Sequence, residues 1–73
     1  MDERVIVSPV AGVFTPRPDM PETVTVGSLL GHVRTGAADV EVRSPFEGRL
    51  IAMSAVHGER LEPYQRVAWL RAA

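Results

Sequence analysis

The sequence of 73 residues contains no cysteine and no lysine. Without cysteine, neither a disulfide framework nor a thiolate metal site can stabilise the fold. The eight arginines are spread along the chain and form no basic stripe of the kind that binds nucleic acid. The absence of lysine removes every side-chain amine that could be joined to a carboxylic acid as an amide. A genome that favours arginine would produce the same absence, so the sequence leaves its origin open.

Long apolar runs are also absent, and none approaches the ~20 residues of a membrane-spanning helix. The chain starts with Met1, Asp2, Glu3 and Arg4, whose acidic character is unlike that of a signal peptide. We therefore expect a cytoplasmic protein that binds neither membrane nor nucleic acid. The length predicts a single domain, residues 1–73, which would bury only about 60% of its unfolded surface. Such a domain has little room for an enzyme cleft, and we expect no catalytic residue.

The sequence repeats itself. Ser8-Pro9-Val10-Ala11-Gly12 recurs 36 residues later as Ser44-Pro45-Phe46-Glu47-Gly48. Three apolar markers, Val24, Leu30 and Val33, recur 37 residues later as Leu61, Val67 and Leu70. Ser, Pro and Gly are common turn residues, but two sets of markers at nearly the same offset indicate two equivalent halves.

The local patterns predict short strands. Val5–Val7 is a β-branched run, Val40–Arg43 alternates apolar and polar residues, and 48–54 lies between turn residues. Prolines make 15–23 an extended loop. Pro63 is compatible with the start of a C-terminal helix, but the repeat favours a strand there, because the matching segment around Leu30–Val33 is predicted to be one.

Two equivalent halves of about four short strands predict an all-β fold, a flattened barrel or sandwich with a pseudo-twofold axis. Its core is expected to take one alternating face of each strand, with Trp69 covering one end. The expected core residues are Val5, Val7, Val13, Val24, Leu30, Val33, Val40, Val42, Leu50, Leu61, Val67 and Leu70.

The segment 30–48 resembles the hairpin of lipoyl and biotinyl carrier domains, whose pattern is Leu-x-x-Ile-Glu-Thr-Asp-Lys-Ala-x-x-Glu-x-x-Ser-Pro-x-x-Gly. The chain aligns with it without a gap. In the first half, Ser8–Phe14 followed by 16–19 is similar to acetyl-CoA carboxylase carrier proteins, and Tyr64 stands where the family usually has a turn glycine. The matching residues of the hairpin segment are Leu30, Val33, Thr35, Ala38, Glu41, Ser44, Pro45 and Gly48. The resemblance implies a barrel-sandwich hybrid fold over nearly the whole chain.

The chain departs from the family pattern at the residues that carry the family's function. A lysine at the hairpin tip carries the cofactor in this family, and Ala37 occupies its position, between Gly36 and Ala38. The resemblance therefore implies a domain with no biotin or lipoate cofactor, and we expect Gly36 to close the turn with a positive φ. Since carrier domains are recognised through their hairpin end, it implies contact with a protein, such as a carboxylase or acyltransferase subunit. The expected contact residues are Thr35, Gly36, Ala37, Ala38 and Phe46.

The other candidate residues favour ordinary surface roles. His32 and His57 would need to converge with Glu59 or Glu62 to bind a metal, and they fall on a strand and in a turn of different halves. No serine and histidine have the spacing of a catalytic triad. Aromatic side chains are favoured at interfaces, and Phe14, Phe46, Tyr64 and Trp69 are candidates for one, as is Met20 in the proline loop. Phe46 is the strongest of them.

The residues leave other functions open. A small molecule or cofactor could bind between the two halves, although no motif marks a pocket. A homodimer could form across an exposed strand edge. An atypical carrier would have to use the N-terminal amine.

Overall fold

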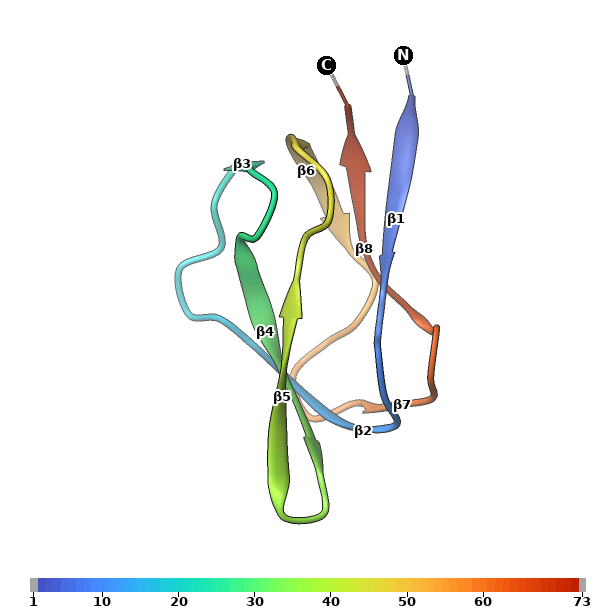
Figure 1. Ribbon diagram of the computed structural model, residues 1–73. Coiled ribbons are helices and arrows are strands. Elements are labelled where there is room, and N and C mark those ends of the chain that lie inside the picture. The colour runs from blue at the N-terminus through green and yellow to red at the C-terminus, as the bar shows by residue number, and fades with distance from the viewer. Residues whose placement is uncertain (1, 73) are drawn as a thin grey trace.

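In the computed structural model, which describes residues 2–72, the chain forms eight short antiparallel strands in two four-stranded sheets (Figure 1). This confirms the all-β fold expected from the sequence. Residues 1 and 73 of the expected domain lie outside the described residues. The strands are β1 Glu3–Val7, β2 Gly12–Pro16, β3 Thr23–Val24, β4 Leu29–Thr35, β5 Ala38–Arg43, β6 Gly48–Met53, β7 Arg60–Leu61 and β8 Arg66–Arg71.

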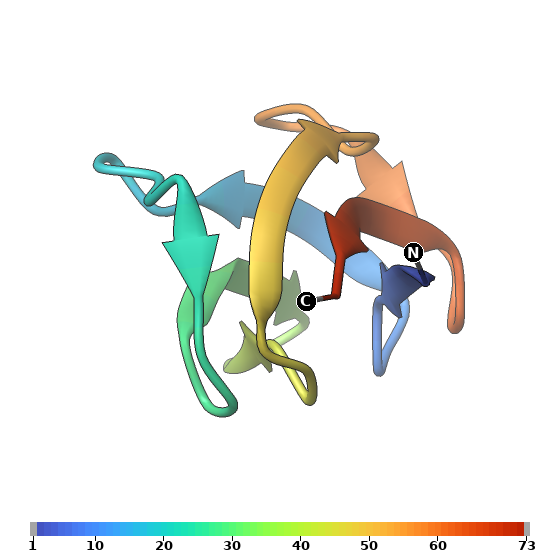
Figure 2. The same ribbon diagram turned by 90° about the horizontal axis from the view of Figure 1, so that it is seen from above.

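The two sheets have the same topology. Sheet A has the strand order β1-β8-β6-β3, and sheet B has the order β5-β4-β2-β7. Exchanging the first four strands with the last four converts one order into the other, as a pseudo-twofold axis requires. The view from above shows the two sheets wrapped into a flattened barrel (Figure 2). The C-terminal segment is a strand, β8, which pairs with both β1 and β6.

The repeated Ser-Pro-x-x-Gly motif makes the same turn twice. The hydroxyls of Ser8 and Ser44 are buried, and each donates a 2.6 Å hydrogen bond to the carbonyl two residues further on. At the end of each motif, a glycine lies against a backbone carbonyl. A Cβ on Gly12 would stand 2.2 Å from the oxygen of Arg34, and one on Gly48 would stand 2.6 Å from that of Arg71. The motif therefore recurs because both sheets need a hydrogen-bonded turn followed by a residue without a side chain.

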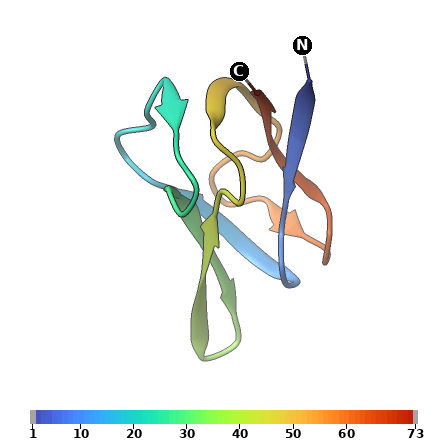
Figure 3. The ribbon, with the colours of Figure 1, turned by 45° about the horizontal axis from the view of Figure 1, so that its top comes forward.

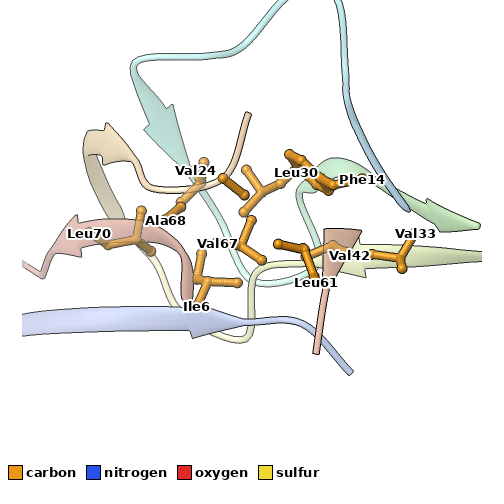
Figure 4. Close-up of a cluster of buried hydrophobic side chains, with 11 residues drawn as sticks. Ile6, Phe14, Val24, Leu30, Val33, Val42, Leu61, Val67, Ala68 and Leu70 are labelled. Atoms are coloured by element: carbon orange, nitrogen blue, oxygen red, sulfur yellow. The ribbon is translucent and has the colours of Figure 1, made fainter. Parts of the chain in front are cut away.

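The core lies between the sheets and draws equally on both (Figure 4). Seven of the expected core residues are buried: Val24, Leu30, Val33, Val42, Leu61, Val67 and Leu70. The buried hydrophobic residues that the sequence did not predict are Ile6, Phe14, Ala55 and Ala68.

The predictions for β1 and β2 were wrong by one residue. Ile6 and Phe14 point into the core, whereas Val7 and Val13 are each 38% exposed and Val5 is half-buried. A shift of one residue turns every side chain of a strand to the other face, and in these two strands apolar residues stand next to each other, so either face looked acceptable. Val40 and Leu50 are also only half-buried.

The β4–β5 hairpin projects from one end of the molecule, and the two termini lie at the other end (Figures 1 and 3). The amide of Ala72 donates a 2.8 Å hydrogen bond to the carbonyl of Asp2, which holds the ends of β1 and β8 together. By the pseudo-symmetry these ends correspond to the hairpin tip. Within residues 2–72 no helix is present that could cross a membrane.

Candidate protein-contact site

The projecting hairpin is a tight one. β4 and β5 pair in register from Val33 opposite Val40 to Thr35 opposite Ala38, which leaves a loop of two residues, Gly36 and Ala37. Gly36 has φ +58°, while Ala37 has no positive φ. These signs are those of a type II′ turn, which takes glycine at its first central position. The positive φ expected for Gly36 is confirmed.

The hairpin tip presents small side chains. Gly36, Ala37 and Ala38 are exposed and Thr35 is half-buried. No atom beyond the chain neighbours lies within 4 Å of the place a Cβ would take on Gly36. Ala37 therefore points a methyl group toward solvent, which can contact another surface but has no amine that could form an amide with an acyl group.

An ion pair stands directly behind the tip. Arg34 and Asp39 are cross-strand partners, and the guanidinium Nη2 lies 3.2 Å from the carboxylate Oδ2. Both side chains are at least half exposed, so the pair is available to a partner as well as to solvent.

A second ion pair lies further along β5. Arg43 donates two hydrogen bonds to Glu41, at 2.9 and 3.1 Å, and a third, of 2.6 Å, to the carbonyl of Gly27. The hydrogen bond from Arg43, its positive charge and the nearby His32 hold the pKa of the Glu41 carboxyl below its ordinary value, and partial desolvation opposes them. The hydrogen bonds to Glu41 and Gly27 hold Arg43 between β5 and the turn before β4.

Phe46 lies apart from the hairpin tip. It follows the other end of β5, where its ring is half-buried against the core and 5.7 Å from the guanidinium carbon of Arg4. The structure therefore brings Thr35, Gly36, Ala37 and Ala38 together and places Phe46 on a different part of the surface.

The other side chains considered for an interface differ in exposure. Phe14 is fully buried, so its expected exposure was wrong, and Met20 packs against the core rather than standing free. Tyr64 is 77% exposed. It has φ +66° in a turn that matches the one containing Gly27, which has φ +93°. Tyr64 thus occupies a left-handed position that usually takes glycine, as the family pattern suggested.

The two histidines lie where the sequence placed them. His32 is in β4, opposite Glu41, and His57 is exposed in the turn before Gly58. Among the residues that the structure describes, no three His, Cys, Asp or Glu side chains come close enough to hold a metal ion.

A groove that the sequence did not reveal runs between two edge strands, β1 of sheet A and β5 of sheet B. It has a volume of about 480 Å³, and its lining is mostly apolar with Glu41 and Arg43 on one wall. Its lining pairs by pseudo-symmetry, Ile6 with Val42 and Pro9 with Pro45, so the groove lies between the two halves. The sequence repeat could have indicated this groove, because β1 and β5 are the first strands of the two equivalent halves.

Comparison with known proteins gives a likeness of fold. No protein-family model matches the sequence, and no curated protein matches it. The structure superposes on part of the urea carboxylase of Kluyveromyces lactis with a TM-score of 0.84, at 18% identity over 97% of this chain. It also superposes on part of a succinylglutamate desuccinylase/aspartoacylase from Rhodobacter sphaeroides with a TM-score of 0.69, at 21% identity over 90% of this chain. The chain spans 6% of the first protein and 21% of the second. These likenesses support the biotinyl-like fold expected from the sequence.

Proposed function

We propose that the protein is a biotinyl-like domain without cargo, which works in the cytoplasm by contact between its hairpin end and another protein. The observation that carries the proposal is the hairpin tip. It projects as a carrier hairpin must, yet it ends in Gly36 and Ala37 and the chain has no lysine. In this proposal residues 1–73 act as one domain without catalytic activity.

The partner we propose is a subunit of a biotin-dependent carboxylase or a similar multi-subunit enzyme, such as an acyltransferase. The likeness to a short part of a urea carboxylase supports this choice. Since a fold by itself is a weak guide to function, and the second similar structure is named for deacylation, the partner must be identified by experiment. The contact end consists of Thr35, Gly36, Ala37 and Ala38, and Phe46 is a separate contact.

The direct test is capture of partners from the native cells by the tagged protein, with mass spectrometry of what is bound. Ala37→Asp changes the tip at an exposed residue without a positive φ. The matched control is Val26→Asp, which adds the same charge at a residue that is 71% exposed in the turn before β4. We expect the wild type and Val26→Asp to capture a carboxylase or acyltransferase subunit, and Ala37→Asp to lose it. Equal capture by both variants would contradict contact through the tip.

The intact mass of the protein from its own cells separates this proposal from an atypical carrier. We expect the mass of the unmodified chain. Biotin, lipoate or an acyl group on the N-terminal amine would replace the proposal with the carrier alternative.

The groove between β1 and β5 supports a second candidate function, binding of a small apolar molecule. Its volume of about 480 Å³ and its mostly apolar lining with a charged pair are typical of small-ligand sites. A ligand that binds only the folded state raises the melting temperature. A rise with biotin, lipoate or an acyl-CoA, abolished by Val7→Glu at a 38% exposed residue that lines the groove, would favour this function over protein contact.

A further inference from the structure

The outer faces of the two sheets are pseudo-equivalent in backbone but opposite in chemistry. In sheet B the middle row of outward side chains is polar. It runs across β5, β4 and β2 as Glu41, His32 and Thr15. The equivalent row of sheet A is apolar, and it runs across β1, β8 and β6 as Val5, Trp69 and Ala52.

Two further apolar side chains lie next to this row on the outer face of sheet A. A register shift between Leu50 and Ala52 inserts Ile51, which is 46% exposed. Val7, on β1 beside this row, is exposed as well. Trp69 is half-buried and lies between Val5 and Ala52 in the middle row of sheet A, so the expectation that it covers one end of the barrel was wrong. We call Val5, Val7, Ile51, Ala52 and Trp69 the apolar face. The three strands that carry it lie side by side in Figure 3.

Arginines flank the apolar face on both sides. On one side the guanidinium carbon of Arg66 lies 5.2 Å from the centre of the Trp69 ring. On the other, Arg49 and Arg71 are cross-strand neighbours. The carboxylate in these rows is that of Glu3, 3.3 Å from Arg71. Within the described part of the chain, the apolar face is thus bordered by three arginines and one carboxylate.

We propose that this face binds an acidic polypeptide segment, one whose apolar side chains pack on Trp69 and whose flanking carboxylates meet the arginines. Trp and Arg are the side chains most enriched among residues that dominate binding energy. Complementary charges also speed association and fix the orientation of the partner. The proposal concerns a surface distinct from the hairpin tip and does not depend on it.

A second copy of this chain is a poor occupant of the face. Two such faces packed together would place six arginines against two Glu3 carboxylates, and like charges brought together oppose association. An anionic membrane is also a poorer match, because a membrane-bound surface buries its apolar side chains about 5–10 Å deep. Here the largest apolar side chain of the face, Trp69, is half-buried with Arg66 over its ring.

The probe is a displayed library of random peptides, selected on the purified full chain. Trp69 is the sole tryptophan, so its fluorescence reports occupancy of the face directly in every protein except Trp69→His, whose peptide binding is measured by calorimetry alongside that of the wild type. Each test variant introduces the residue found at the equivalent position of sheet B. Trp69→His introduces the counterpart of His32, and Arg66→Leu introduces the counterpart of Leu29. The controls are His32→Ala on the opposite sheet and Ala37→Asp at the hairpin tip. Circular dichroism of each variant verifies the fold.

We expect selected peptides to combine apolar residues with flanking Asp and Glu, and to change the Trp69 emission. Trp69→His and Arg66→Leu should each weaken their binding about tenfold or more, while both controls bind as the wild type does. Peptides without acidic residues, or binding that survives Trp69→His, would overturn the proposal. So would binding of phosphatidylserine vesicles in place of peptides, or sedimentation as a dimer that Trp69→His dissociates. Because Ala37→Asp leaves this binding intact, failure here is separable from failure of the hairpin proposal.

Discussion

Residues 3–35 and 38–71 form two copies of one four-strand unit, and several backbone hydrogen bonds of one copy recur in the other. The amide of Gly27 bonds the carbonyl of Ser44 at 2.7 Å, and that of Tyr64 bonds the carbonyl of Ser8 at 2.7 Å. The amide of Ser8 bonds the carbonyl of Gln65, and that of Ser44 bonds the carbonyl of Ser28. The barrel therefore depends on a set of contacts that each half supplies in the same way.

The halves differ where the backbone does not constrain the side chain. The first strand carries Val5 and Val7 where its counterpart carries Glu41 and Arg43, and Trp69 stands in the place of His32. Repeated features thus report what the fold requires, while unequal features mark surfaces that the fold leaves free. The tip and the apolar face belong to the second kind.

The two halves differ in the core at the equivalent positions of Phe14 and Leu50. Phe14 is fully buried, whereas Leu50 is half-buried. We expect Phe14→Ala to lower the free energy of unfolding by about 3–5 kcal/mol. Leu50→Ala should cost only about 1–2 kcal/mol, because less apolar surface leaves water there. Urea unfolding of both variants measures the difference, and equal losses would contradict the asymmetry of the core.

Both glycines of the repeated motif, Gly12 and Gly48, should be intolerant of a side chain. Gly12→Ala and Gly48→Ala each drive a Cβ into a backbone carbonyl, which cannot move aside as a side chain can. We expect each to lower the free energy of unfolding by about 1–3 kcal/mol, with Gly12→Ala the more severe. Gly36→Ala, which meets no atom within 4 Å, serves as a control that carries only the strain of its positive φ. Tolerance at Gly48 alone would show that the halves differ in backbone packing.

The equivalent turn residues Gly27 and Tyr64 show how much a left-handed backbone conformation costs in stability. A left-handed conformation costs a residue with a Cβ about 1–2 kcal/mol, so Gly27→Ala should lower the free energy of unfolding by about 1 kcal/mol. Tyr64→Gly should raise it by about 0.5 kcal/mol, since the relief of strain exceeds the added freedom of the unfolded chain. Thermal unfolding of both variants tests this, and a large loss in Tyr64→Gly would show that the tyrosine ring stabilises the fold.

The smallest effect concerns Glu41 and Arg43, which replace Val5 and Val7 in the second half. A carboxyl whose pKa is lowered by folding contributes stability above its unfolded pKa and loses that contribution as the pH falls through the folded pKa. We expect Arg43→Gln to raise the pKa of Glu41 toward its ordinary value and to shift the onset of acid unfolding upward in pH. NMR titration of the Glu41 carboxyl reports the first effect directly. An unchanged pKa would show that His32, rather than Arg43, sets it.

The fold could be predicted from the sequence because both halves of the repeat carry the same pattern of turns and strands. The Ser-Pro-x-x-Gly motifs located both turns, and the alternation in Val40–Arg43 gave the buried face of β5 correctly at Val42. The register of β1 and β2 could not be predicted from the apolar pattern of each strand alone, because apolar neighbours such as Ile6 and Val7 satisfy either face. Matching the halves residue by residue would have placed Ile6 with the buried Val42.

The candidate site was only partly predictable. The tip residues Thr35 to Ala38 are consecutive, so any hairpin brings them together. Phe46 was grouped with them although β5 begins at the tip and ends before Phe46, so the order of the elements already places Phe46 at the far end of that strand. The apolar face could not be recognised, because its side chains come from three strands that are distant in the sequence.

The central claim, that the hairpin tip contacts a partner, is tested most directly by a photo-crosslinking amino acid placed at Ala37 in the native cells, with the same amino acid at Val26 as the control. The account predicts a covalent adduct with one protein, a carboxylase or acyltransferase subunit, from position 37 and none from position 26. An absence of adducts at position 37, or the same adducts from both positions, would contradict it.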